Sequence, residues 1–75
     1  MNNYHYTVIF EPLKDGGYNV VFPAIPEICT FGETIKEAKS MAEDALKCYL
    51  ESVLKENGAI PEDKEPAIAQ IAVTV

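Results

Sequence analysis

Apolar and polar residues alternate in the first part of the chain. From Tyr4 to Phe10 every second position is aromatic or aliphatic, which is the period-two pattern of a half-buried strand. A second run of the same kind extends from Tyr18 to Phe22. Between the two runs, Gly16 and Gly17 permit the positive φ angles of a tight turn. The pattern predicts a β-hairpin with one apolar face, formed by Tyr4, Tyr6, Val8, Phe10, Tyr18, Val20 and Phe22.

The middle of the chain predicts a short strand followed by one long helix. The strand is expected from Glu27 to Phe31, with Gly32 ending it. Thr34 and Glu37 have the spacing of a capping box, in which both side chains accept hydrogen bonds from the free amides at a helix start. Apolar residues then recur at intervals of three and four, which makes one stripe along about six helical turns. These residues are Ile35, Ala38, Ala42, Ala45, Leu46, Tyr49, Leu50, Val53 and Leu54.

The helix is expected to end at Asn57 and Gly58, because these residues tolerate the left-handed backbone of a C-terminal cap. Residues 67–75 alternate again, with Ala69, Ile71, Val73 and Val75 on one face, and predict a fourth strand. The order is then βββαβ. This arrangement is an α+β fold, in which an antiparallel sheet and one long helix form a two-layer sandwich.

A series of short motifs lies in fixed order along residues 4–61. Each motif occurs in many folds, but their order and spacing are specific. The series includes Asp15-Gly16-Gly17-Tyr18, Phe22-Pro23, Pro26, Cys29-Thr30, Gly32-Glu33-Thr34, Glu37-Ala38, Tyr49-Leu50 and Ile60-Pro61. In this series the sequence resembles the short form of the HicB family of type II antitoxins.

The resemblance implies a partial RNase H-like fold that forms dimers or higher oligomers. It also implies that the chain binds a HicA-type toxin, a small ribonuclease that cleaves mRNA, and masks its active site. Glu27 departs from the family, which usually has Gly there. Longer relatives continue into a segment that binds the operator, so we expect residues 1–75 to form a single HicB-like domain without a C-terminal DNA-binding module.

Length and charge restrict the partners. A chain of 75 residues, 48% of them apolar, has room for one small core, so self-association is expected. Six lysines and no arginine stand against twelve acidic residues, a net charge of −6. Since phosphate binding depends on clustered Lys and Arg, direct nucleic-acid binding is not expected. An acidic chain instead suits a basic partner.

Most of the negative charge lies outside the predicted helix. We expect acidic residues of the connecting segments to contact the toxin: Glu27, Glu33, Glu62, Asp63 and Glu65. The alternative is that these carboxylates only improve solubility and complete caps and turns. A second open question is whether a toxin exists, because the domain could also be an orphan oligomerisation or adaptor module.

Catalysis is not expected. A degenerate RNase H-like hydrolase would need several carboxylates around a metal ion, but Glu11 and Asp15 flank a turn and the first strand has none inside it. His5 is the single imidazole, and together with Cys29 and Cys48 it falls short of a four-ligand zinc site. Both cysteines are expected to be thiols that pack as small apolar residues.

No cofactor motif is present, so no cofactor or metal is predicted. The first residues have neither the basic nor the apolar region of a secretory leader, and no apolar run approaches the roughly 20 residues of a membrane span. We therefore expect a cytoplasmic protein that does not contact membranes.

Overall fold

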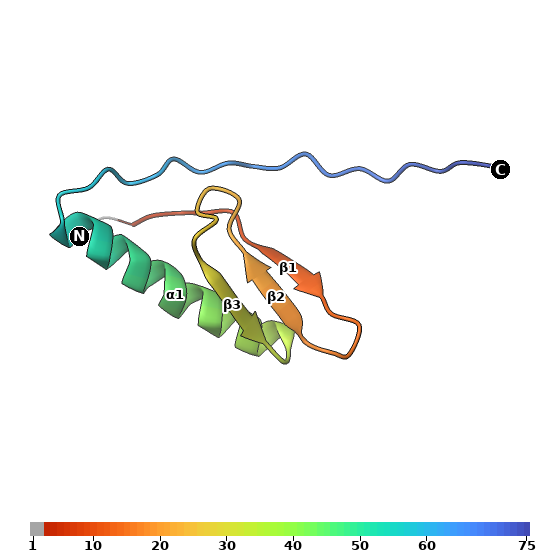
Figure 1. The fold of residues 1–75 in the computed structure, drawn as a ribbon, viewed down its shortest axis with the longest axis horizontal. Coiled ribbons are helices and arrows are strands. Elements are labelled where there is room, and N and C mark those ends of the chain that lie inside the picture. Colours follow the sequence, from red (N-terminus) through yellow and green to blue (C-terminus); the bar gives the residue numbers. More distant parts are fainter. Residues whose placement is uncertain (1–2) are drawn as a thin grey trace.

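The computed structural model describes residues 3–75 and contains three strands followed by one helix. The strands are β1 (Ile9–Pro12), β2 (Tyr18–Val21) and β3 (Cys29–Gly32), and the helix is α1 (Ile35–Lys55). The strands form one antiparallel sheet in the order β1-β2-β3, and α1 crosses one face of it (Figure 1). The structure thereby confirms the α+β class and the βββα order.

The β1–β2 hairpin closes through the two glycines. In the turn, the amide of Leu13 donates to the carbonyl of Gly17 over 2.9 Å. Gly16 and Gly17 have φ angles of 100° and 83°, which confirms the prediction that this turn needs positive φ. A Cβ on Gly17 would also lie 2.5 Å from the ring of Phe31, so this ring would have to shift, in addition to the backbone strain that the positive φ imposes on other residues.

The first strand is shorter than predicted. Pairing begins at Ile9, opposite Val21, and residues 4–8 lead into β1 without a strand partner. The reason lies in β2, which ends at Val21 because the chain turns immediately afterwards. The carbonyl of Phe22 accepts from the amide of Ile25 over 3.0 Å, and this turn leaves no backbone opposite residues 4–8.

The close approach of α1 to β3 depends on Gly32. This residue is the last of β3, is buried, and pairs with Tyr18. A Cβ on it would lie 2.3 Å from the backbone nitrogen of Ala38. The third strand was predicted at residues 27–31 and lies at Cys29–Gly32. It begins later because the chain first makes a second turn, in which the amide of Ile28 donates to the carbonyl of Ile25 over 3.1 Å.

Both helix caps are confirmed. The Thr34 hydroxyl accepts from the amide of Glu37 over 3.0 Å, and the Glu37 carboxylate accepts from the amide of Glu33 over 3.4 Å. At the other end, Asn57 has a φ of 57°. The amide of Gly58 donates to the carbonyl of Val53 over 2.8 Å, which is the hydrogen bond of a Schellman motif.

The core is small and lies between α1 and the sheet. The helix contributes Ala38 and Ala42, whose short side chains let it approach β3 and β2 closely. The ends of the predicted apolar stripe are not covered, since Ile35 is 40% and Leu54 is 49% exposed. Of the predicted aromatic face, Phe22 is buried, while Tyr4 is exposed. The buried cluster consists of Val20, Phe22, Ile25, Ala38 and Ala42.

The predicted fourth strand does not form within this chain. Residues 67–75, called the tail below, contain no strand residue and run past the sheet (Figure 1). Ile71 and Val73 are 86% and 80% exposed. The radius of gyration is 14.8 Å, against about 11 Å for a compact chain of this length. A strand needs a neighbour for its hydrogen bonds, and the tail has none among residues 3–75.

Among the described residues, no helix has the length and apolar character to cross a membrane.

Candidate functional site

The five acidic residues predicted to contact a partner are all exposed, but they are not all together. Glu33 precedes α1, whereas Glu27 contacts Tyr49 near the other end of the helix. At about 1.5 Å per residue, Thr34 and Tyr49 are separated by about 22 Å along the helix axis. Glu33 therefore lies apart from Glu27.

Glu27 joins the connector before β3 to the helix. Its Oε2 atom accepts a hydrogen bond from the Tyr49 hydroxyl over 2.9 Å. This hydrogen bond, more than burial, raises the pKa of Tyr49, because a phenol that donates to a carboxylate must keep its proton. Glu27 thus creates a contact between two elements.

Asp63 joins the segment after the helix to the segment before β1. Its two carboxylate oxygens accept from Thr7, one from the amide over 2.9 Å and the other from the hydroxyl over 2.8 Å. These hydrogen bonds, first the one from the amide, lower the pKa of Asp63. Beside them the Tyr6 hydroxyl donates to the carbonyl of Pro61. We call these contacts the Thr7–Asp63 clamp.

The two contacts lie at the same end of the molecule. Tyr4 and Tyr6 line the same groove, and Tyr6 is near enough to Tyr49 to help raise the pKa of the Tyr49 phenol. Burial, followed by the charge of Asp63, raises the pKa of Tyr6. Three phenols and two carboxylates thus form one surface, called the carboxylate–tyrosine surface below: Tyr4, Tyr6, Tyr49, Glu27 and Asp63.

This surface has the chemistry of a protein-binding site. Carboxylates accept charge-assisted hydrogen bonds from Lys and Arg, and tyrosine supplies a rigid apolar ring with a polar end, which favours it as an interface anchor. The contribution of Tyr49 was missed from the sequence, because it falls on the apolar stripe of the helix and was assigned to the core. Its hydroxyl is the only signal that could have indicated a polar contact.

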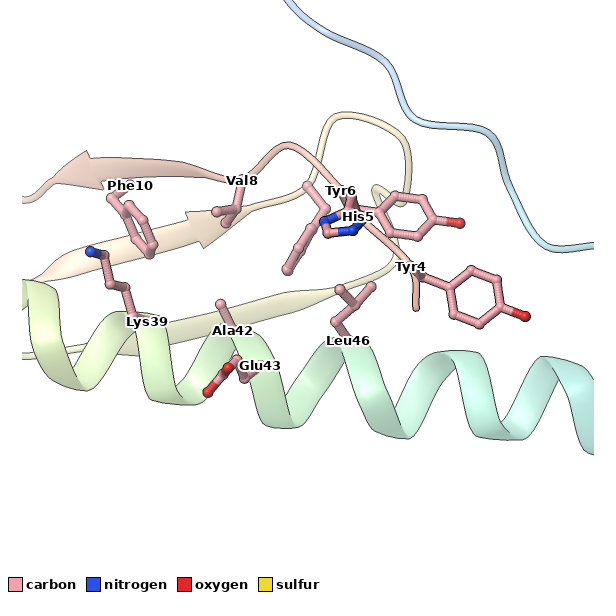
Figure 2. A pocket seen from close by; sticks show the side chains of 10 residues that line it. Tyr4, His5, Tyr6, Val8, Phe10, Lys39, Ala42, Glu43 and Leu46 are labelled. Carbon is pink, nitrogen blue, oxygen red and sulfur yellow. The ribbon is translucent and has the colours of Figure 1, made fainter. Parts of the chain in front are cut away.

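Beside this surface lies a groove of about 470 Å³ between residues 4–10 and α1 (Figure 2). Val8 and Phe10 point into it from one side, and Ala42 and Leu46 from the helix. The groove is mainly apolar. His5, Lys39 and Glu43 also line it, so its charged groups include both signs.

The residues considered for catalysis are not gathered. Glu11 and Asp15 are both exposed, one at the end of β1 and the other in the hairpin turn. Within residues 3–75, no group of three or more His, Cys, Asp or Glu side chains is placed to hold a metal ion. Cys29 and Cys48 are free thiols, as expected. The prediction that they pack in the core is wrong, because both are exposed.

Known proteins are similar to most of the chain. Antitoxin HicB 1 of Photorhabdus laumondii is 46% identical over 61 residues, 81% of this chain and 39% of that protein. Antitoxin HicB of Escherichia coli K12 is 43% identical over 75% of this chain and 41% of its own length. A UPF0150 protein of Thermoplasma acidophilum is 43% identical over 84% of this chain and 91% of its own length.

The chain therefore spans about two fifths of the named antitoxins that it matches. Residues 6–73 match the sequence model of the HicB-like antitoxins of bacterial toxin–antitoxin systems. The match includes all three strands, the helix and the four residues of the Thr7–Asp63 clamp. The chain belongs to the HicB-like antitoxin family of bacterial toxin–antitoxin systems.

Proposed function

We propose that this protein neutralises a HicA-type toxin, an mRNA-cleaving ribonuclease, by binding over its active site. The observation that carries the proposal is the carboxylate–tyrosine surface, in which Glu27 and Asp63 are held in position by hydrogen bonds in a chain of the HicB-like family. The protein acts by binding and has no catalytic step of its own. Its place of action is the cytoplasm, where the mRNA lies.

The charges support this proposal. A ribonuclease binds the phosphates of RNA with cationic side chains. A partner of net charge −6 without arginine is attracted to the same cations, and the attraction raises the association rate. The tyrosine rings then supply apolar contact area once the surfaces meet.

Two matched double variants show whether toxin binding depends on where the negative charges lie or only on the net charge. In Glu27→Lys/Asp63→Lys the substitutions fall on the carboxylate–tyrosine surface, and in Glu11→Lys/Asp15→Lys they fall around the hairpin turn. Each pair changes the net charge from −6 to −2. We expect the first pair to weaken toxin binding by at least about 100-fold, and the second by less than about tenfold, as for a rim charge.

The experiment uses a HicA-type gene, sought beside the gene of this protein. Co-expression should restore growth, and the purified chains should elute as one complex whose dissociation constant is measured by calorimetry. Circular dichroism must show that both double variants keep the helix. Growth arrest that persists with the wild-type chain, or equal weakening by the two pairs, would contradict the proposal.

One observation favours a second candidate. The Thermoplasma acidophilum relative is matched over 91% of its length and carries no antitoxin name. The second candidate is accordingly an oligomerisation or adaptor module without a toxin. In that case no toxin gene lies beside the gene of this protein, and its self-association is unchanged by any HicA-type protein.

A further inference from the structure

The tail has the composition of a strand but is exposed along its whole length. Residues 67–75 carry no charged side chain, although the chain around them is strongly acidic. Ile68, Ile71 and Val73 are each 80% or more exposed, which is far more than an isolated segment of a folded domain usually leaves to water. Each apolar side chain on this segment lacks a neighbour that would cover it.

The sheet has an open edge of matching character. β1 has only β2 as a neighbour among residues 3–75, so the backbone groups on its other side are unpaired. α1 packs mainly on β3 and β2 and leaves the apolar groove uncovered beside β1. Figure 2 shows Val8, Phe10 and Leu46 around this groove. A strand added to β1 would place alternate side chains into it.

The tail of the same chain does not pair with this edge. The Thr7–Asp63 clamp holds residues 61–63 beside Tyr6 and Thr7, and Pro66 keeps the preceding residue extended. From there the tail continues past the hairpin (Figure 1). The molecule measures 53 Å in this direction and 25 × 19 Å in the other two. Nine residues of strand reach about 30 Å, enough to cross onto another molecule.

We propose that the tail forms the fourth strand on β1 of a second copy of this chain. Ile71 and Val73 then fill the groove of the second copy, whose own tail fills the first groove, as twofold symmetry requires. Because the tail has no charged side chain, its side chains add no repulsion when it approaches an acidic domain. This inference deepens the self-association expected of the family and does not depend on the toxin.

A matched pair of variants tests which face of the tail is buried. Ile71→Lys places a charge on the face directed into the groove, and Gln70→Lys places the same charge one position away on the opposite face. By size-exclusion chromatography with light scattering, the wild-type chain and Gln70→Lys should have twice the 8.3 kDa of one chain. Ile71→Lys should be a monomer, with a dissociation constant raised at least about 100-fold, because each dimer carries the substitution twice.

The exchange of tails between two copies of the chain is observed by NMR in a sample mixed from two differently labelled preparations. We expect intermolecular nuclear Overhauser effects between Ile71 and the side chains of Val8 and Phe10. A monomeric wild-type chain would overturn the inference, since the tail would then fold back on its own β1 or stay free. So would a dimer that Ile71→Lys leaves intact, because its interface would lie elsewhere.

Failure of the tail exchange can be distinguished from failure of the proposed antitoxin function. A chain that dimerises through the tail but fails to restore growth contradicts the antitoxin activity and leaves the exchange supported. A chain that neutralises the toxin as a monomer contradicts the exchange alone. Circular dichroism of Ile71→Lys must show an intact helix, which is expected because the tail packs on no part of its own domain.

Discussion

Residues 4–10 and residues 67–75 have the same alternating pattern and different structures. In the first segment, Ile9 and Phe10 belong to β1 because β2 lies opposite them. In the second segment no residue is paired. The comparison shows what alternation encodes, which is an extended backbone with one apolar face. Whether the segment becomes a strand depends on a neighbouring edge, and an edge is supplied by other parts of the fold or by another molecule.

The two regions also differ in how they are attached. β1 is fixed through a two-glycine turn and a ladder to β2. The tail is attached through the Thr7–Asp63 clamp, in which Thr7 donates to the Asp63 carboxylate and the Tyr6 hydroxyl donates to the carbonyl of Pro61. The first attachment is hydrogen-bonded backbone over a buried core, and the second is exposed. We expect substitutions in the first region to change the free energy of unfolding, and those in the second to change the position of the tail.

The largest effect is expected from Gly32→Ala. The added Cβ would lie 2.3 Å from the backbone of Ala38, so helix and sheet must separate, at a cost of about 2–4 kcal/mol. Urea unfolding followed by circular dichroism measures this loss. Gly16→Ala is the matched control, because its Cβ meets no atom within 4 Å. Only the strain of the positive φ then lowers the free energy of unfolding, by about 1 kcal/mol. Equal losses would show that close packing at Gly32 is not required.

Asp63→Asn should release the tail without unfolding the body. The amide side chain loses the charge that strengthens both hydrogen bonds from Thr7, so the amide of Thr7 should exchange with solvent at least about tenfold faster. Hydrogen exchange followed by NMR measures this rate. Glu62→Gln, one residue earlier, is the control that removes a charge but no recorded hydrogen bond. Unchanged exchange in Asp63→Asn would mean that the clamp does not protect this amide.

The clamp should also depend on pH. Hydrogen bonds from Thr7 lower the pKa of Asp63 below its ordinary value of 3.8. A lowered carboxyl pKa stabilises the clamped state above the ordinary value, and this contribution is lost as the pH falls through the lowered pKa. NMR titration of the Asp63 carboxyl should give a midpoint below 3.8 that moves back toward it in Thr7→Ala. A midpoint unaffected by that substitution would contradict the assigned cause.

The smallest effect is expected from Tyr49→Phe. It removes the hydrogen bond to Glu27 and leaves the ring in place, so the melting temperature should fall by no more than about 3 °C. In the wild-type chain the Tyr49 phenol should titrate above 10.0 by ultraviolet absorbance, and Glu27→Gln should bring that pKa closer to it. If Glu27→Gln leaves the titration unchanged, the carboxylate is not the cause of the raised pKa.

Turns, caps and the helical stripe were predictable because the signals that specify them are local. Gly16 and Gly17 specify the hairpin turn, and Thr34 specifies the start of α1 from side chains within a few residues. The length of β1 was not predictable in this way. It depends on the turn after Phe22, which removes the partner of residues 4–8 although nothing in those residues indicates a boundary.

In the candidate site, too, some features could be predicted from local sequence and others depend on distant segments. Composition and charge directed attention to Glu27 and Asp63, but not to their partners Tyr49 and Thr7, which are 22 and 56 residues away. Such pairs form only when separate elements are packed together. The exposure of Cys29 and Cys48 was missed for a similar reason, since their preference for burial was outweighed by positions on faces that the core does not cover.

From its sequence this protein is recognisable as an α+β member of the HicB-like family, because short-range hydrogen bonding and side-chain periodicity specify turns, caps and one amphipathic helix. Packing in three dimensions determines which part of an alternating run is paired and which carboxylates meet tyrosine or threonine. It also leaves the groove beside β1 and the apolar tail both open. The physical reason is that long-range pairs depend on the position of distant segments, about which local pattern carries no information.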